Sequence, residues 1–194
     1  MGLDMYLNKA PRYNDATMKD ISAIESWLSW KNRKPEFSDF SFEKWSGRKL
    51  EDVKLEYYID FYGNFYQERY YIWDIEHKYP VKSIIQEVGY WRKANHIHKW
   101  FVNNVQDGID DCDYHREVTK EDLEKLLTIC EEIKSNDDFT VAMEKLPTTS
   151  GFFFGGTEYD EWYMYAIEET IKICKKVLEE TDFGTEMIYY RSSW

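Results

Sequence analysis

Apolar and polar residues alternate at the start of the chain, where polar or amphipathic residues separate Leu3, Met5 and Leu7. This period of two over residues 1–9 predicts a β-strand with one buried face. The ending EMIYYRSSW predicts a second strand. We expect these two strands to pair, because a strand is stable only beside a partner.

Apolar residues recur at helical spacing in residues 17–30 and again in residues 81–105. The second segment carries apolar side chains on two nearly opposite sides. A helix of this kind has no broad face for solvent, so the pattern predicts one continuous, mostly buried central helix over residues 81–105.

Two further helices have start signals in the sequence. Thr119 with Asp122 three residues later resembles a capping box, and Thr157 with Asp160 repeats the signal. Apolar residues follow each signal at helical spacing. We therefore expect two amphipathic helices, each with its apolar face turned to the core.

The stretch between the first two helices has a different character. Residues 31–53 show no sustained period and are interpreted as an ordered loop, and residues 55–75 predict a hairpin around Gly63 and Asn64. No repeat or linker divides the chain. The sequence therefore predicts one α+β domain over residues 1–194, in which the long central helix and two or three other helices pack on a small sheet that includes both terminal strands.

Composition narrows the class of protein. The 194 residues are 43% hydrophobic and carry a formal charge of −12. No apolar run approaches the ~18 residues of a membrane span, and the N-terminus lacks the apolar core of a signal peptide, so we expect a cytoplasmic protein that does not enter membranes. The acidic charge disfavours nonspecific nucleic-acid binding. The 16 Tyr, 11 Phe and 8 Trp indicate either a binding surface or an aromatic-rich core.

The best candidate for a site is a polar row within the predicted central helix. At helical spacing Arg92, Asn95 and His98 lie side by side, with Trp91 next to them. Two readings stay open, because buried polar groups need partners. The groups either bond to other parts of the fold or line a pocket, where Arg92 meets an anion, Trp91 stacks on a ring, and Asn95 and His98 contact polar edges.

Other candidates lie outside this row. His96 and Lys93 are expected to point elsewhere and to be solvated. The segment from Gly151 to Tyr163 predicts a strand, a glycine turn and a helix start, but its glycine spacing matches no phosphate-binding motif. We interpret it either as a plain turn or as the edge of a pocket that faces a base or ribose, with Phe153, Tyr159 and Trp162 as ligand-binding residues.

The sequence offers little support for metal binding or catalysis. Residues 107–115 gather four Asp, Cys112 and one His, but at no spacing of a known metal site, so neither a metal nor a cofactor is expected. Cys130 and Cys174 fit the apolar faces of helices. No nucleophile lies at a motif spacing from a base, and we assign no catalytic residue. His98 acting as a general base remains a weaker alternative.

Four segments together resemble an uncharacterised family of phage and prophage proteins: GLDMYL, EVGYWRKANHIHKWFV, LPTTSGFFFGGTEYDEWY and YYRSSW. The resemblance covers residues 1–8 and about 87–194. Members of that family are usually shorter, which implies that residues 31–80 are an aromatic-rich insertion. No activity follows from the resemblance. It implies a small accessory protein in the cytoplasm of a host cell, and proteins of that kind often counter host immunity.

The leading hypothesis is a protein that binds a small nucleotide-like molecule and acts as a sponge for an immune signal. The first alternative is an acidic, tyrosine-rich inhibitor that binds a host defence protein. The second is an enzyme that degrades a nucleotide signal. The sequence leaves open whether the protein is a homo-oligomer.

Overall fold

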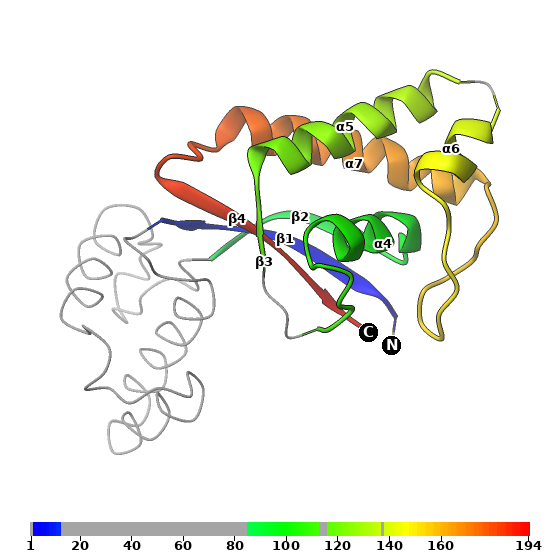
Figure 1. Cartoon of the computed structure of the whole chain (residues 1–194), viewed down its shortest axis with the longest axis horizontal. Coiled ribbons are helices and arrows are strands. Elements are labelled where there is room, and N and C mark those ends of the chain that lie inside the picture. Colours follow the sequence, from blue (N-terminus) through cyan, green and yellow to red (C-terminus); the bar gives the residue numbers. More distant parts are fainter. Residues whose placement is uncertain (1, 13–84, 113–115, 137) are drawn as a thin grey trace, which may run out of the picture. The chain divides into compact units, whose positions relative to one another are not determined.

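The computed structural model describes residues 2–12, 85–112, 116–136 and 138–194 (Figure 1). By its internal contacts the chain divides into two units, residues 1–12 with 87–194 and residues 13–86. The helix, loop and hairpin expected within residues 17–75, and the insertion expected at residues 31–80, lie outside the described residues.

The sheet of the first unit has four strands in the order β2-β1-β4-β3. Their bounds are β1 Asp4–Pro11, β2 Gln86–Arg92, β3 Arg116–Val118 and β4 Glu186–Ser193. Strands β1 and β3 each run antiparallel to β4. The prediction that the first and last strands pair is therefore confirmed, and so is the α+β class.

Strand β1 forms as its alternating sequence predicts. Leu3, Met5 and Leu7 are fully buried, whereas Asp4 and Tyr6 are half-buried. Tyr190 of β4 lies opposite Leu7 in the register, so its ring joins the same buried face. This face of the sheet supplies the floor of the hydrophobic core.

The helices cover this face of the sheet (Figure 1). They are α4 Asn95–Asn104, α5 Lys120–Lys134, α6 Thr140–Lys145 and α7 Glu161–Glu180. Helices α5 and α7 pack side by side. As expected, Cys130 and Cys174 are free thiols in the apolar faces of α5 and α7, and burial raises the pKa of Cys174 to about 12.

One of the two predicted helix starts is confirmed. Thr119 caps α5 through a full capping box, in which its hydroxyl accepts from the N–H of Asp122 at 3.1 Å. The other start is wrong by three residues. The N-cap of α7 is Asp160, not Thr157. The Asp160 carboxylate accepts from the N–H groups of Trp162 and Tyr163, and aspartate is among the preferred N-cap residues.

The prediction of one continuous helix over residues 81–105 is wrong. The segment is strand β2 followed by α4, and the chain reverses at Lys93, whose φ is 57°. Strand β2 pairs with the second edge of β1, where the Lys93 N–H donates to the Leu3 carbonyl at 2.8 Å. A Cβ at Gly89 would lie 2.6 Å from the side chain of Ile173, so glycine is required where β2 passes α7.

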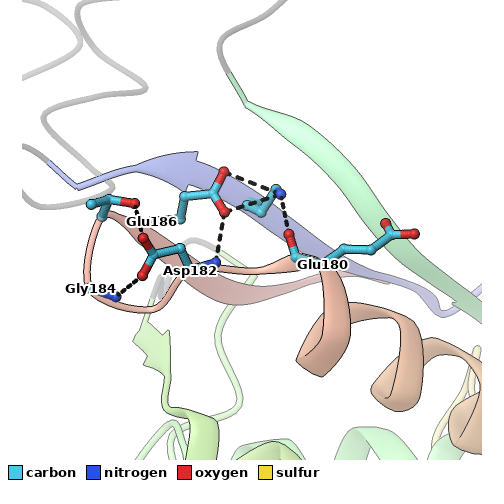
Figure 2. Close-up of polar contacts among 6 residues, drawn as sticks. Glu180, Asp182, Gly184 and Glu186 are labelled. Carbon is cyan, nitrogen blue, oxygen red and sulfur yellow. Dashed lines mark hydrogen bonds and ion pairs between the residues drawn. The ribbon is translucent and has the colours of Figure 1, made fainter.

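The turn from α7 into β4 is fixed by polar contacts to β1 and within itself. The Lys9 ammonium of β1 contacts the Glu180 carbonyl at 3.3 Å and the Glu186 carboxylate at 3.2 Å. Figure 2 shows how Asp182 accepts from the N–H of Gly184 while its own N–H donates to Glu186. These contacts tie the end of α7 to β1, a central strand of the sheet.

Within the described part of the chain, none of the helices combines the length and the apolar character that a bilayer crossing requires.

Candidate ligand-binding site

Two cavities open beside helix α4. The larger, about 760 Å³, is bounded by residues 90–96, by the loop around Gly155 and Gly156, and by the first half of α7; we call it the β2–α7 cavity. The smaller, about 390 Å³, lies between α4, residues 149–154, Asp110 and Trp194, and we call it the Trp194 cavity. The larger volume is typical of sites for small organic ligands.

The seven ligand-binding residues expected from the sequence are divided between these cavities. The β2–α7 cavity is lined by four of them: Trp91, Arg92, Asn95 and Trp162. His98 and Phe153 line the Trp194 cavity. Tyr159 lines neither cavity and instead packs against the rings of Phe139 and Tyr163.

The expected row of polar residues on one helix is wrong. Trp91 and Arg92 belong to β2, whereas Asn95 and His98 belong to α4, because the chain turns at Lys93. Successive residues of a strand point to opposite faces, so Trp91 and Arg92 diverge. Trp91 is only 3% exposed and its indole N–H donates to the Thr170 hydroxyl at 2.9 Å, which places most of its ring in the core.

Two cations stand at the junction of β2 and α4. Arg92 is exposed, and its Nε lies 3.9 Å from a carboxylate oxygen of Asp4. Lys93 is also exposed, as expected, and has a left-handed backbone conformation. Gly155 packs against it: a Cβ there would lie 3.0 Å from the Lys93 Cβ, and its own φ is +90°. Only glycine fits this approach without strain.

Asn95 holds the loop between the two cavities. Its amide group donates to the carbonyls of Phe154 at 3.2 Å and Gly156 at 2.7 Å, and its oxygen accepts from the N–H of Thr149 at 2.9 Å. Residues 147–160 contain no strand, so the strand expected after Gly151 is wrong. The three bonds to Asn95 give this irregular loop its shape and use most of the amide's hydrogen-bonding capacity.

His96 is buried, and the expectation that it is solvated is therefore wrong. It is 4% exposed, and its ring lies 4.1 Å from the ring of Tyr163 on α7. Burial lowers the pKa of His96 to about 3, so the imidazole is neutral at physiological pH. Its Nε2 has no hydrogen-bond partner among the described residues, although His96 lines the β2–α7 cavity.

Aromatic rings and carboxylates complete the wall of the β2–α7 cavity. Trp162 is 78% exposed, and Tyr165 and Tyr90 are also exposed. An exposed indole offers a large flat surface on which the ring of a ligand can stack. The carboxylates of Glu158 and Glu169 face the same space.

The Trp194 cavity is lined by His98, whose two ring nitrogens both have hydrogen-bond partners. His98 Nδ1 lies 2.7 Å from the Tyr190 hydroxyl, and its Nε2 lies 3.1 Å from Asp110. The neutral Nε2–H tautomer accepts from Tyr190 and donates to Asp110, so both nitrogens have partners. The same carboxylate oxygen of Asp110 accepts from the Trp194 indole at 3.2 Å. Burial lowers the pKa of His98, and the Asp110 charge partly opposes this shift.

Metal ligands do not gather in the part of the chain that the structure describes: no group there has three or more His, Cys, Asp or Glu side chains that could hold an ion. Residues 113–115 of the acidic segment lie outside that part. The absence of a structural metal stays a prediction.

No model of a protein family matches this chain, and no curated protein or solved structure matches it either.

Sequence reasoning found the neighbourhood of the larger cavity but missed Lys93, His96 and Tyr165. The sequence carries no clear signal for the first two, because residues 86–92 alternate in burial in the folded chain but not in polarity along the sequence. Tyr165 carries no clear signal either, because its exposure depends on how α7 packs on α5 and the sheet.

Proposed function

We propose that the protein binds a small nucleotide-like molecule in the β2–α7 cavity. One observation carries the proposal: a single cavity of about 760 Å³ is lined by two cations, Arg92 and Lys93, and by the exposed rings of Trp162 and Tyr165. Arginine and lysine attract an anionic group, and an exposed indole offers a stacking surface for a base.

The carboxylates of the cavity suit the rest of such a ligand. Glu158 and Glu169 are acceptors only, so they favour hydroxyl or amino donors of the kind that a ribose or a base carries. Asp160 is already engaged by the N–H groups of Trp162 and Tyr163. The wall therefore offers an anion-binding part and a donor-binding part to the same molecule.

The cavity favours binding over chemistry. Among its described residues, His96 is the one imidazole, and it has no carboxylate partner to orient it or to take up a proton. A ligand held without being turned over fits a sponge that sequesters a nucleotide signal. Such a role agrees with the resemblance of the sequence to phage accessory proteins, and we propose it on that ground.

The test is to incubate the purified protein with a panel of nucleotide signals, remove the unbound molecules, denature the protein and analyse what is released. Intact recovery supports a sponge, an altered ligand indicates an enzyme, and no uptake refutes the proposal. Trp162→Ala should reduce uptake at least tenfold. Phe152→Ala is the matched control, because Phe152 is 94% exposed but does not line the β2–α7 cavity.

Phe152 also supports the second candidate function, an inhibitor that binds a host protein. Its side chain projects from the loop beside the Trp194 cavity and contacts only the edge of the Phe153 ring among the aromatic residues described. Large exposed aromatic residues are typical anchors at protein interfaces. If uptake fails in the experiment above and Phe152→Ala abolishes capture of a host protein, this function takes precedence.

A further inference from the structure

Helix α4 begins without a cap inside the β2–α7 cavity. Its N-cap residue is Ala94, which has no side chain that can accept a hydrogen bond, and its first turn contains no acidic residue. The first bond of the helix runs from the His98 N–H to the Ala94 carbonyl, so the N–H groups of Asn95, His96 and Ile97 have no acceptor within the helix. The longer helices α5 and α7 are both capped by side chains.

Two cationic residues precede the start of α4, and one of them, Lys93, has a strained backbone conformation. Arg92 and Lys93 directly precede Ala94 and line the same cavity. Lys93 has a φ of 57°, a conformation that favours glycine and is disfavoured for a lysine. Residues held in such conformations cluster at functional sites.

The carboxylates that face this helix start have other partners nearby. Glu158 accepts from the Thr157 N–H at 3.0 Å, and Glu169 accepts from Lys172 at 2.6 Å. Asp160 caps α7. Lys93 forms no ion pair with a carboxylate among the described residues, so its charge stays available in the cavity.

His96 supplies an independent sign that a ligand atom belongs here. A buried polar atom without a hydrogen bond destabilises the fold, and native proteins rarely keep one without a reason. His96 belongs to the first turn of α4 and lines the cavity beside Lys93, and its Nε2 is fully buried without a partner. In the Nε2–H tautomer the ring is a neutral donor, like the backbone N–H groups around it.

We propose that the start of α4 is an oxyanion site, where Lys93, the Nε2–H of His96 and the first N–H groups of the helix bind a phosphate-type group. The helix dipole adds a partial positive charge at this point. This inference rests on the proposed function, since it assigns the phosphate of the nucleotide-like ligand to a position. It names two residues that the ligand's phosphate requires and its base does not.

The test uses inorganic phosphate as the first probe. Titration into the full-length ¹⁵N-labelled protein should shift the amide signals of residues 95–97 and the imidazole signal of His96, with saturation. His96→Phe and Lys93→Asn should each weaken this binding at least tenfold. Phenylalanine keeps the ring on Tyr163, and asparagine tolerates the left-handed backbone. Lys99→Asn is the control, because Lys99 lines the Trp194 cavity.

A second arm separates free phosphate from the phosphate of a nucleotide. Adenosine monophosphate should bind at least tenfold more tightly than adenosine, and the two variants should remove that difference. If phosphate shifts these signals but neither nucleotide nor nucleoside is taken up, the oxyanion site stands and the nucleotide proposal fails. If phosphate has no effect, or acts equally on the variants and the wild type, the oxyanion site is refuted while the nucleotide panel still tests the proposed function.

Discussion

Two histidines stand two residues apart on the same short helix and have opposite surroundings. His98 is enclosed between β4 and Asp110, with a partner for each ring nitrogen. His96 faces α7, packs its ring at a tilt against the ring of Tyr163, and has an Nε2 without a partner. Burial lowers the pKa of both. His98 therefore has a structural role, whereas His96 lines the β2–α7 cavity with a buried Nε2 that no protein group satisfies.

Helix geometry explains the difference. Residues two apart on an α-helix point about 160° apart, so the side chains of His96 and His98 reach different layers of the fold. His98 meets the sheet, and His96 meets the helical layer. A buried histidine is thus informative about function only when the partners of both of its nitrogens are known.

The largest effect on stability is expected when His98, whose ring nitrogens both have partners, is replaced. His98→Phe keeps most of the shape of the ring but leaves the fully buried Tyr190 hydroxyl without its acceptor. We expect a loss of about 3 kcal/mol in the free energy of unfolding, from the lost bonds and the stranded hydroxyl. Urea denaturation would measure it.

A double-mutant cycle supplies the control for His98→Phe. Adding Tyr190→Phe removes the stranded hydroxyl, so the double variant should recover about 1 kcal/mol or more relative to the sum of the two single losses. A loss below about 1 kcal/mol for His98→Phe alone would contradict the architectural role and reopen His98 as a ligand contact.

The pH dependence of stability sharpens the comparison. A histidine whose folded pKa is lowered binds its proton mainly in the unfolded state, so its stabilising effect is complete above about pH 6.5 and declines as the pH falls towards the folded pKa. For His96, with a folded pKa of about 3, the loss between pH 7 and pH 5 should be about 2 kcal/mol.

The measurement is urea denaturation of wild type and His96→Phe at both pH values. The variant should lose about 2 kcal/mol less than the wild type over this interval, because it lacks one proton-binding group of the unfolded state. Equal losses in the two proteins would mean that His96 is solvated, as the sequence alone suggested.

The sequence predicted an element of the fold correctly where its signal lay within a few residues, and less well where the signal extended over a long segment. The alternation of Leu3, Met5 and Leu7 predicted the buried face of β1, and Thr119 with Asp122 predicted the start of α5, since both signals lie within a few residues and have few alternatives. The prediction for residues 81–105 was wrong because the two apolar stripes of this segment are compatible with two structures. One is a single helix, and the other is a strand, a turn and a shorter helix. The second structure forms because β2 pairs with the edge of β1 that β4 leaves open, and this edge exists only in the folded chain.

The candidate site was predictable only in part, for a related reason. The residue types were right for a pocket, since Arg92, Asn95 and Trp162 do line the larger cavity. Their roles depend on partners far along the chain: Asn95 bonds to residues 149–156, and Trp91 bonds to Thr170. No local pattern encodes such contacts, so a buried structural amide and a ligand-binding amide look alike in the sequence.

A smaller effect is expected when the unpartnered histidine is replaced at neutral pH. His96→Phe removes a buried polar atom that has no protein partner and keeps a ring of similar shape against Tyr163. We expect the free energy of unfolding at pH 7 to stay the same or rise by up to about 1 kcal/mol. Urea denaturation at pH 7 without ligand is the measurement. A loss above 2 kcal/mol would show that Nε2 has a structural role.

The smallest effect on stability is expected for Arg92→Met. This variant tests a cation of the β2–α7 cavity in the same way as the variants above test the two histidines. The Arg92 side chain is 59% exposed, and its contact to Asp4 at 3.9 Å is a surface ion pair, so the free energy of unfolding should change by no more than about 0.5 kcal/mol. Uptake of a phosphate-bearing ligand should nevertheless fall severalfold, since the variant removes a cation from the wall of the cavity.

Arg191→Met is the matched control for Arg92→Met. Arg191 is also exposed and also contacts its surroundings weakly, with its guanidinium 5.3 Å from the ring centre of Tyr6, but it does not line the β2–α7 cavity. It should leave both stability and uptake unchanged. If Arg92→Met instead costs about 3–5 kcal/mol, as truncation of a buried ion pair would, then Arg92 belongs with His98 to the architecture. The anionic group of a ligand would then have to rest on Lys93 and the start of α4 alone.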